Sequence, residues 1–169
     1  CRAAGEVADG FHVHPMHTVP YLKEVVRPAL DEGAKTRGKS VADLELYSPV
    51  FVVTGDSEAE RAKMEHAVRR QIAFYASTPS YGAVLDFHGH SDLGKKLGGM
   101  MREGRLDEMS AHVPDSLLSE IVLFAPSNVL GARLRQRYDG VLDRISLYST
   151  MGGEGSFSAW RELVSAIHA

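Results

Sequence analysis

The spacing of apolar residues switches along the chain between the period of a helix and that of a strand. Apolar positions three and four apart predict helices, whereas alternating or short β-branched apolar runs predict strands. The predicted elements are a helix tail (2–8), a strand (10–14), a helix after Thr18, a strand (46–54), helices over 57–77, 114–124 and 127–138, a strand (142–148), and a last amphipathic helix with Trp160, Leu163, Val164 and Ile167. This order predicts an α/β fold with parallel strands and right-handed crossovers.

Particular residues sharpen these predictions. Pro28 should kink the helix after Thr18, and Pro49 should mark the start of the second strand or a bulge in it. The sequence Ser57-Glu58-Ala59-Glu60 is a capping box that predicts the start of the next helix. The apolar stripes that should face one another across a helix-covered sheet are expected to bury Val50, Val52, Val68, Ile72, Leu134 and Ile145.

Residues 78–104 differ from the rest because they are rich in glycine and open with Thr78-Pro79. We predict turns and short helices there, as an insertion near the active edge of a single domain over 1–169. His88 and His90 within this segment are expected to be surface residues.

Composition and charge exclude several classes of function. The net charge is −3 and the basic residues do not cluster, which argues against nucleic-acid binding. One cysteine, Cys1, excludes an internal disulfide framework and favours a reducing, cytoplasmic setting. No apolar run approaches the ~20 residues of a membrane helix, and no signal peptide is evident. The chain opens inside a helical pattern without an initiator Met, which predicts a piece of a longer polypeptide.

Two His-x-His pairs are candidates for chemistry. In His12-Val13-His14 the two imidazoles share one face of the predicted strand, and the strand should end at Pro15. Such a pair could bind a metal, so a metal-dependent hydrolase is one alternative. Such hydrolases also need His or Asp ligands on later strand ends, which here are Thr54 and Tyr148. We therefore assign no metal site.

Three separate stretches together resemble one family. They are AGEVADG at 4–10, VFVVTGDSEAERAKMEHAVRRQIAFY at 50–75, and NVLGARLRQRYDGVLDRISLY at 128–148. In order and spacing they are similar to the luciferase-like flavin- or deazaflavin-dependent oxidoreductases (monooxygenases). The resemblance implies the C-terminal portion, about strands six to eight, of a (β/α)8 TIM barrel of the bacterial luciferase-like type.

The resemblance implies hydride transfer between the deazaflavin coenzyme F-420 or FMN and a small organic substrate. Cofactor binding is expected to need the family's phosphate loop, which would precede Cys1. Backbone N–H groups in the loop after the last strand should also bind an anion. The site residues predicted on this basis are His14 as the catalytic proton donor or acceptor, His12, His17 and Thr54 for the substrate, and Ser149, Thr150, Gly152 and Gly153 for the cofactor.

About three of eight strands cannot close a barrel alone. Open strand edges attract other chains, so a companion chain carrying the other strands, or a homodimer, is the expected partner. The alternative within the same fold is a non-catalytic remnant or assembly subunit.

Overall fold

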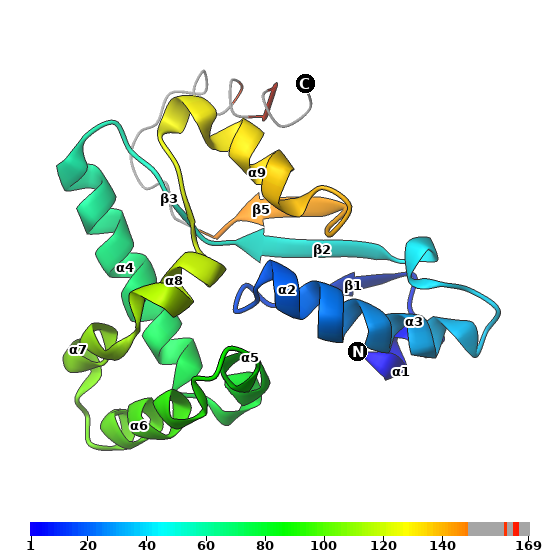
Figure 1. Ribbon diagram of the computed structural model, residues 1–169, viewed down its shortest axis with the longest axis horizontal. Helices are drawn as coiled ribbons and strands as arrows, with labels where there is room; N and C mark the ends of the chain where they lie inside the picture. Colours follow the sequence, from blue (N-terminus) through cyan, green and yellow to red (C-terminus); the bar gives the residue numbers. More distant parts are fainter. Residues whose placement is uncertain (149–160, 162–163, 166–169) are drawn as a thin grey trace.

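A parallel sheet of three strands organises the computed structural model, which describes residues 1–148, 161, 164 and 165. The strands are β1 (Gly10–His12), β2 (Glu45–Val50) and β5 (Arg144–Leu147), in the order β1-β2-β5 (Figure 1). Phe11 lies opposite Leu46 in the β1–β2 register. The three predicted strands are therefore neighbours and parallel, although β1 ends at His12, earlier than predicted.

The second predicted strand, 46–54, is interrupted at Phe51. Its last part, β3 (Val52–Val53), pairs in parallel with a short strand, β4 (Leu123–Phe124), and not with β5. The helix predicted over 114–124 is wrong at its end, because α8 (Asp115–Ile121) stops before β4. The two residues of β4 are a strand only because they pair with the segment around β3, where Leu123 N–H donates to the Phe51 carbonyl at 2.9 Å.

Pro49 lies inside β2, opposite Ser146 of β5, and not at a strand start or bulge as predicted. Along a parallel strand, successive residues direct their backbone groups to opposite neighbours. The Tyr47 carbonyl accepts from Val13 N–H on the β1 side. Two residues on, Pro49 faces the same side, where β1 has already ended. The missing N–H of Pro49 therefore breaks no ladder hydrogen bond.

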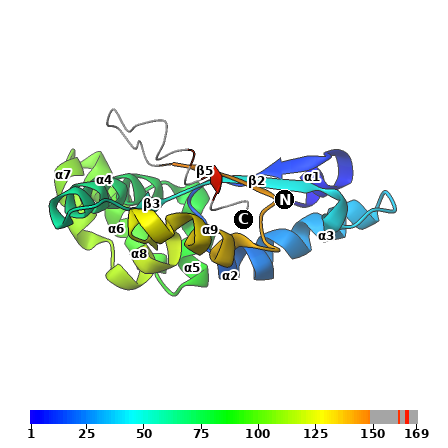
Figure 2. The same cartoon turned by 90° about the horizontal axis from the view of Figure 1, so that it is seen from above.

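Helices cover one face of this sheet. They are α2 (Val19–Tyr21), the π-helical turn η1 (Leu22–Val26), α3 (Arg27–Lys35) and α9 (Leu130–Tyr138), which follows η5 (Ser127–Val129). Figure 2 shows α2, α3 and α9 on the same side of the strands. Leu46, Ser48 and Val50 point to this side and are fully buried, whereas Glu45 is exposed and Tyr47 only half-buried.

The helix after Thr18 begins as predicted, because the Thr18 hydroxyl accepts from Tyr21 N–H. The kink predicted at Pro28 is a local widening of the helix. Pro28 has no N–H to donate, and its ring would clash with a carbonyl of the preceding turn. The chain forms a π turn just before it, in which Arg27 N–H binds the Leu22 carbonyl.

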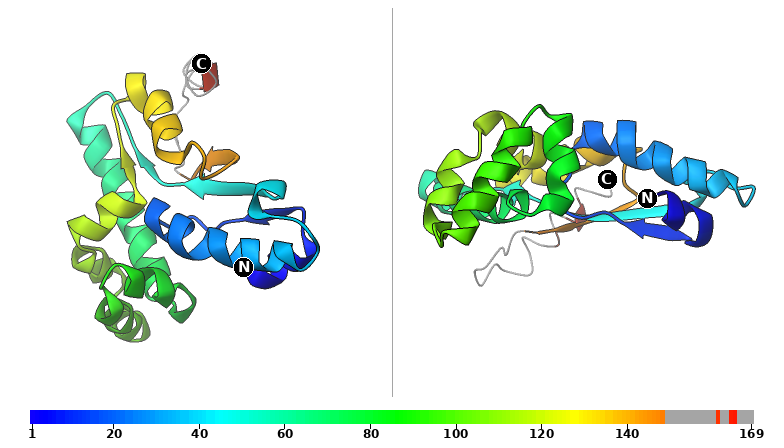
Figure 3. Two further views of the ribbon diagram at one scale, coloured as in Figure 1. Left: turned by 45° about the vertical axis from the view of Figure 1, so that its right-hand side comes forward. Right: turned by 90° about the horizontal axis from the view of Figure 1, so that it is seen from below.

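A second group of helices lies at the carboxyl ends of the strands (Figures 1 and 3). Its elements are α4 (Glu58–Ala76), η3 (Pro79–Tyr81), α5 (Gly82–Phe87), α6 (Ser91–Arg102), α7 (Leu106–Met109), η4 (Ser110–His112) and α8. The predicted capping box is present, with Ser57 and Glu60 each accepting from the other's backbone N–H. Turns and short helices over 78–104 are confirmed, while the status of this segment as an insertion stays a prediction.

Five of the six predicted core residues are buried: Val50, Val52, Val68, Ile72 and Leu134. The sixth, Ile145, is only half-buried, so that prediction is wrong. Ile145 lies on β5, an edge strand with no further strand beside it among the described residues. Of the predicted last helix, Val164 is helical and exposed, whereas Trp160, Leu163 and Ile167 lie outside the described residues. Within the described ranges, no helix combines the length and apolar character needed to cross a membrane.

A close helix contact explains two glycines. Helix α1 (Arg2–Val7) packs on α3 through Gly5 and Gly33. A Cβ atom on Gly5 would overlap the Leu30 carbonyl oxygen, and one on Gly33 would overlap the Arg2 carbonyl oxygen. Because both obstacles are backbone, neither can be relieved by a side-chain rotation. Gly5, the first glycine of the AGEVADG stretch, therefore has a packing role.

We predict that Gly33→Ala destabilises the fold and that Gly82→Ala does not. The first change must push α1 away from α3, and overpacking of this kind costs ~1–3 kcal/mol. Gly82 is the matched control, because it is helical and a Cβ there would meet nothing within 4 Å; the alanine should be neutral or stabilising by ~0.4–1 kcal/mol. Urea unfolding midpoints measure both. Equal midpoints for Gly33→Ala and the parent chain would contradict this packing.

Candidate functional site

Aromatic side chains from distant parts of the chain meet at the carboxyl edge of the sheet. His14 follows β1, Tyr148 follows β5, Tyr75 comes from α4 and Tyr81 from η3. The His14 ring lies 4.5 Å from the Tyr81 ring, nearly stacked, and 4.6 Å from the Tyr75 ring, edge to face. We call His14, Tyr75, Tyr81 and Tyr148 the His14 cluster. It occupies the edge at which parallel α/β proteins bind ligands.

Hydrogen bonds fix the proton on the His14 ring. Its Nδ1 lies 3.1 Å from the Met16 backbone N, and its Nε2 lies 3.0 Å from the Tyr81 hydroxyl oxygen. A backbone N–H only donates, so Nδ1 is the acceptor and the neutral ring carries its hydrogen on Nε2. Partial burial lowers the pKa of His14, and nearby His12 lowers it further. His14 is therefore neutral at pH 7.

Tyr75 and Tyr148 form a hydrogen-bonded pair of hydroxyls within the cluster. Burial, followed by this hydrogen bond, raises the pKa of Tyr75 to about 12. The Tyr148 ring also packs against Phe51, with centroids 4.7 Å apart. Tyr75 thus stays protonated at neutral pH. Its hydrogen bond to Tyr148 connects α4 to the end of β5.

His17 is buried beneath the cluster, with 3% of its surface exposed. Its Nδ1 donates to the His14 carbonyl at 2.9 Å and lies 3.3 Å from the Ser48 hydroxyl. Its Nε2 is buried without a hydrogen-bond partner among the described residues. Burial lowers the pKa of His17 to about 4, although the bond to the His14 carbonyl opposes this shift. A neutral His17 thus holds the backbone that carries His14.

The sheet face opposite the helices carries His12; we call it the uncovered face, with reference to the described residues alone. The His12 ring lies 4.7 Å from that of Tyr47, whose hydroxyl bonds the Ser146 hydroxyl at 2.7 Å. Glu45 and Arg144 form an ion pair on the same face. His12 is exposed, and this face carries the Tyr47 ring, the His12 imidazole and the Ser146 hydroxyl.

The remaining predicted site residues make no contact with the His14 cluster among the described hydrogen bonds, or lie outside the described residues. Thr54 is buried directly after β3, and its hydroxyl lies 3.3 Å from that of Ser127. Its predicted substrate role is untested. The cofactor residues predicted in the last loop, Ser149, Thr150, Gly152 and Gly153, lie outside the described residues.

His88 and His90 are less exposed than was predicted for surface residues. His88 and His90 are both half-buried, and His88 Nε2 lies 2.8 Å from the Thr18 hydroxyl. The neighbouring Phe87 ring packs edge to face on Tyr21, 5.5 Å away. The start of the 78–104 segment is thus attached to the loop and helix that follow β1, so His88 is part of a tertiary contact.

The described side chains form no cluster of three or more metal-ligating residues. In the two His-x-His pairs, both His14 nitrogens are bound within the protein and His88 Nε2 is bound to Thr18. The metal-dependent hydrolase alternative therefore gains no support from this geometry.

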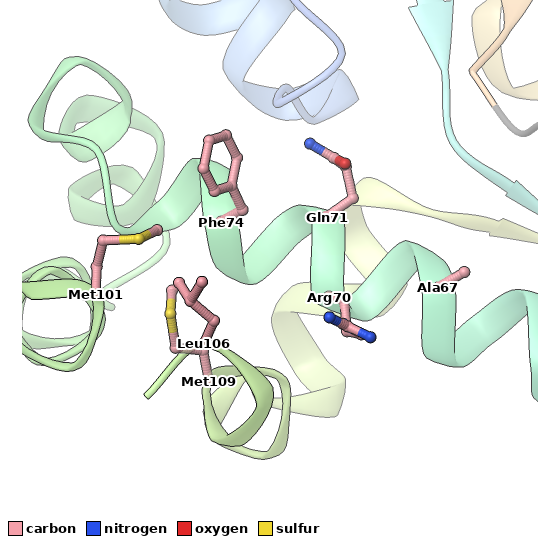
Figure 4. Close-up of a pocket in the computed structure, with 7 residues that line it drawn as sticks. All are labelled: Ala67, Arg70, Gln71, Phe74, Met101, Leu106 and Met109. Carbon is pink, nitrogen blue, oxygen red and sulfur yellow. The ribbon is translucent and has the colours of Figure 1, made fainter. Parts of the chain in front are cut away.

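A separate hollow of about 410 Å³ lies among α4, α6 and α7 (Figure 4). It is lined by Ala67, Arg70, Gln71, Phe74, Met101, Leu106 and Met109. Arg70, its one charged lining residue, pairs with Asp107 at 3.0 Å. This apolar lining lacks the acid–base groups of the His14 cluster, and we assign it no catalytic role.

Sequence reasoning identified His14 but missed its ring partners Tyr81 and Tyr75, and it missed Ser48, which binds the Val13 carbonyl. One signal was present, because Tyr148 directly follows the last strand, where functional residues gather in parallel sheets. No local pattern reveals Tyr81, which reaches His14 across 67 residues.

A parallel sheet with helices on one face, and with ionisable and aromatic groups at its carboxyl edge, defines an α/β protein. The model of the luciferase-like monooxygenase family matches residues 1–144. The chain belongs to this family.

Curated relatives include the uncharacterized proteins Mb1395 of Mycobacterium bovis and Rv1360 of Mycobacterium tuberculosis. Each is 40% identical over 141 residues, which is 83% of this chain and 42% of the relative. The chain thus spans less than half the length of these relatives.

Among solved structures, the coenzyme F-420-dependent tetrahydromethanopterin reductase of Methanopyrus kandleri matches with a TM-score of 0.68 and 18% identity. The match covers 96% of this chain and 45% of that one. It shows that the fold corresponds to part of a luciferase-like TIM barrel.

The depressed pKa of His17 predicts acid sensitivity. In the unfolded chain this imidazole gains a proton near pH 6.5, but in the folded chain only near pH 4. The free energy of unfolding should therefore fall as the pH drops from about 6.5 to about 4, and then level off. At about 1.4 kcal/mol per pH unit, the loss is roughly 3 kcal/mol.

The test compares urea unfolding at several pH values for the parent chain, His17→Asn and the control His66→Asn. The asparagine side chain in His17→Asn can still donate to the His14 carbonyl but does not titrate, so the curve of this variant should be flatter. His66 is exposed on α4, and its variant should follow the parent. Parallel curves for His17→Asn and the parent would rule out His17 as the source.

Proposed function

We propose that this chain forms part of the active site of an oxidoreductase that uses coenzyme F-420 or FMN to transfer a hydride to or from a small organic substrate. The observation that carries the proposal is the His14 imidazole, held between a backbone N–H and a tyrosine hydroxyl at the carboxyl edge of β1. Family membership supports the same reaction class. We further propose that β1, β2 and β5 correspond to about strands six to eight of the barrel.

The described residues fit the ring of such a cofactor. The uncovered face offers the Tyr47 and His12 rings, which suit a planar heteroaromatic group, and the Ser146 hydroxyl beside them. These residues would hold the cofactor ring, and the loop over 149–153 would bind its phosphate. When bound, the cofactor supplies the hydride chemistry.

The chain's own residues would manage binding and protons. His14, neutral at pH 7, holds a proton on Nε2 at the sheet edge. His17 and Ser48 keep the strand end in place, since they donate to the carbonyls of His14 and Val13. The Tyr81 ring, nearly stacked on the imidazole, and the Tyr75 ring, edge to face with it, hold the His14 ring in this position.

We predict that His14→Asn in the assembled oxidoreductase lowers kcat by ~10²–10⁴-fold, because proton transfer at this site, which usually contributes such a factor, depends on the His14 N–H. Asparagine can still accept the Met16 N–H but lacks the Nε2 proton. The measurement is the absorbance change of F-420 or FMN on turnover, together with a fluorescence titration of cofactor binding, which should be unchanged.

The exposed His66 provides the control, and His66→Asn should leave turnover at the parent level. Full activity of His14→Asn would remove His14 from the reaction. A folded assembly that binds neither cofactor would favour the alternative, a non-catalytic subunit of the same fold.

We also propose that another chain covers the sheet in the assembled protein. Both edge strands, β1 and β5, have one side without a strand partner among the described residues. Their open backbone groups and the uncovered face favour pairing with further strands. The partner is a companion chain that carries other strands of the barrel, or a second copy of this chain.

Light scattering and sedimentation of the purified chain test this prediction. We expect a homodimer, or a stable complex when a companion chain is supplied. The physical reason is that exposed parallel edges gain hydrogen bonds on pairing. A well-folded, monodisperse monomer that binds no companion chain would contradict the proposal.

A further inference from the structure

Both ring nitrogens of His14 are already bound within the protein. Met16 N–H occupies Nδ1 at 3.1 Å, and the Tyr81 hydroxyl occupies Nε2 at 3.0 Å. The Tyr81 ring nearly stacks on the imidazole and the Tyr75 ring meets it edge to face. A substrate therefore has no free nitrogen of His14 to approach in this arrangement.

The direction of the His14–Tyr81 hydrogen bond follows from the Met16 contact. Because Nδ1 accepts, Nε2 carries the hydrogen and donates it to the Tyr81 oxygen. Tyr81 then points its own hydroxyl hydrogen elsewhere. Among the hydrogen bonds of the described residues, this hydroxyl makes only the one with His14. Its hydrogen is thus available to a ligand.

We propose that Tyr81 is the group that donates a hydrogen bond or a proton to the substrate, and that His14 is a positioning residue behind it. The inference rests on the function proposed above and names the donor within that site. The matching substrate carries an electron-rich oxygen at the reacting centre, such as a carbonyl or enolate oxygen.

The proton balance of this step is simple. The substrate oxygen takes the Tyr81 hydroxyl hydrogen, so the tyrosine O–H bond breaks and an O–H bond forms on the substrate. The phenolate left on Tyr81 is stabilised by the N–H of His14 Nε2, and a hydrogen bond to a charged oxygen is the stronger kind. A proton from solvent then restores Tyr81.

Two further contacts help to keep Tyr81 beside His14. The segment that begins with η3 is attached to the region after β1 by His88, at 2.8 Å from the Thr18 hydroxyl, and by Phe87 on Tyr21. These contacts come from α5 and its C-terminal end, directly after η3. The segment therefore positions Tyr81 over the strand end.

The first test is Tyr81→Phe, which keeps the stacked ring and removes the hydroxyl. In the assembled oxidoreductase we expect kcat to fall by ~10²–10⁴-fold, with cofactor affinity unchanged. If His14 met the substrate itself, the substitution would free Nε2 and leave kcat at or above the parent value. That result would overturn the proposal.

Tyr21→Phe is the matched control. The Tyr21 hydroxyl makes no hydrogen bond to any described residue, and its ring contact with Phe87 would be kept. Its turnover should equal that of the parent chain. A similar loss in both variants would show a general effect of removing a tyrosine hydroxyl and would overturn the specific role of Tyr81.

The second test needs no cofactor or turnover. Nitrogen-15 NMR of the full chain reports the His14 tautomer, for which we expect hydrogen on Nε2 and none on Nδ1. Tyr81→Phe should shift the Nε2 resonance and leave Nδ1 nearly unchanged. The groups that face this ring are His12, Tyr75 and Tyr81, so the spectra are compared at one fixed pH.

These readouts separate the two proposals. A hydrogen on Nδ1 of His14 overturns the Tyr81 assignment even if the enzyme turns over. So does an Nε2 resonance of His14 that is unchanged in Tyr81→Phe. Absence of turnover with F-420 and FMN in the parent assembly defeats the proposed function, while the NMR result still decides whether His14 donates to Tyr81.

Discussion

The carboxyl end of β1 depends on hydrogen bonds from buried side chains that lie behind it. Ser48 donates to the Val13 carbonyl at 3.1 Å, and His17 donates to the His14 carbonyl at 2.9 Å. These carbonyls lie past the end of the β1–β2 ladder. A buried carbonyl without a partner costs ~1–3 kcal/mol. Two side chains, Ser48 of β2 and His17 of the loop after β1, therefore determine the position of His14.

The same strands give the sheet two chemically different faces. Side chains along a strand alternate between faces, so β2 directs Leu46, Ser48 and Val50 toward the helices and the residues between them the other way. The helix side is a packed core. The uncovered face carries His12 and Tyr47, and in a barrel it would line the interior.

Membership of the luciferase-like monooxygenase family and the geometry around His14 give different kinds of information about this chain. The family model shows which family the chain belongs to, and the matched fold shows that it is part of a luciferase-like barrel. The geometry adds the chain's own contribution, an imidazole whose two nitrogens both have protein partners. In this arrangement the Tyr81 hydroxyl accepts from His14, and its own hydrogen is used by no hydrogen bond among the described residues.

The sequence alone determined the order of the main helices and strands, the parallel sheet and most of the core, because these follow from local periodicity and capping. The Ser57 capping box and the cap at Thr18 need only neighbouring residues. Tertiary structure decided the rest. Strand β4 exists only through its pairing with β3, and Pro49 is tolerated only because β1 has ended beside it.

The candidate site divides in the same way. His14 was predictable, since it closes an alternating strand that follows a helix. Its neighbours were not, because Tyr81 and Tyr75 reach it from 67 and 61 positions away along the chain. The direction of its hydrogen bond was also hidden, since one backbone N–H, at Met16, determines which nitrogen carries the proton. Periodicity indicates the face to which a side chain points, but only the folded chain brings the partners that define its chemistry.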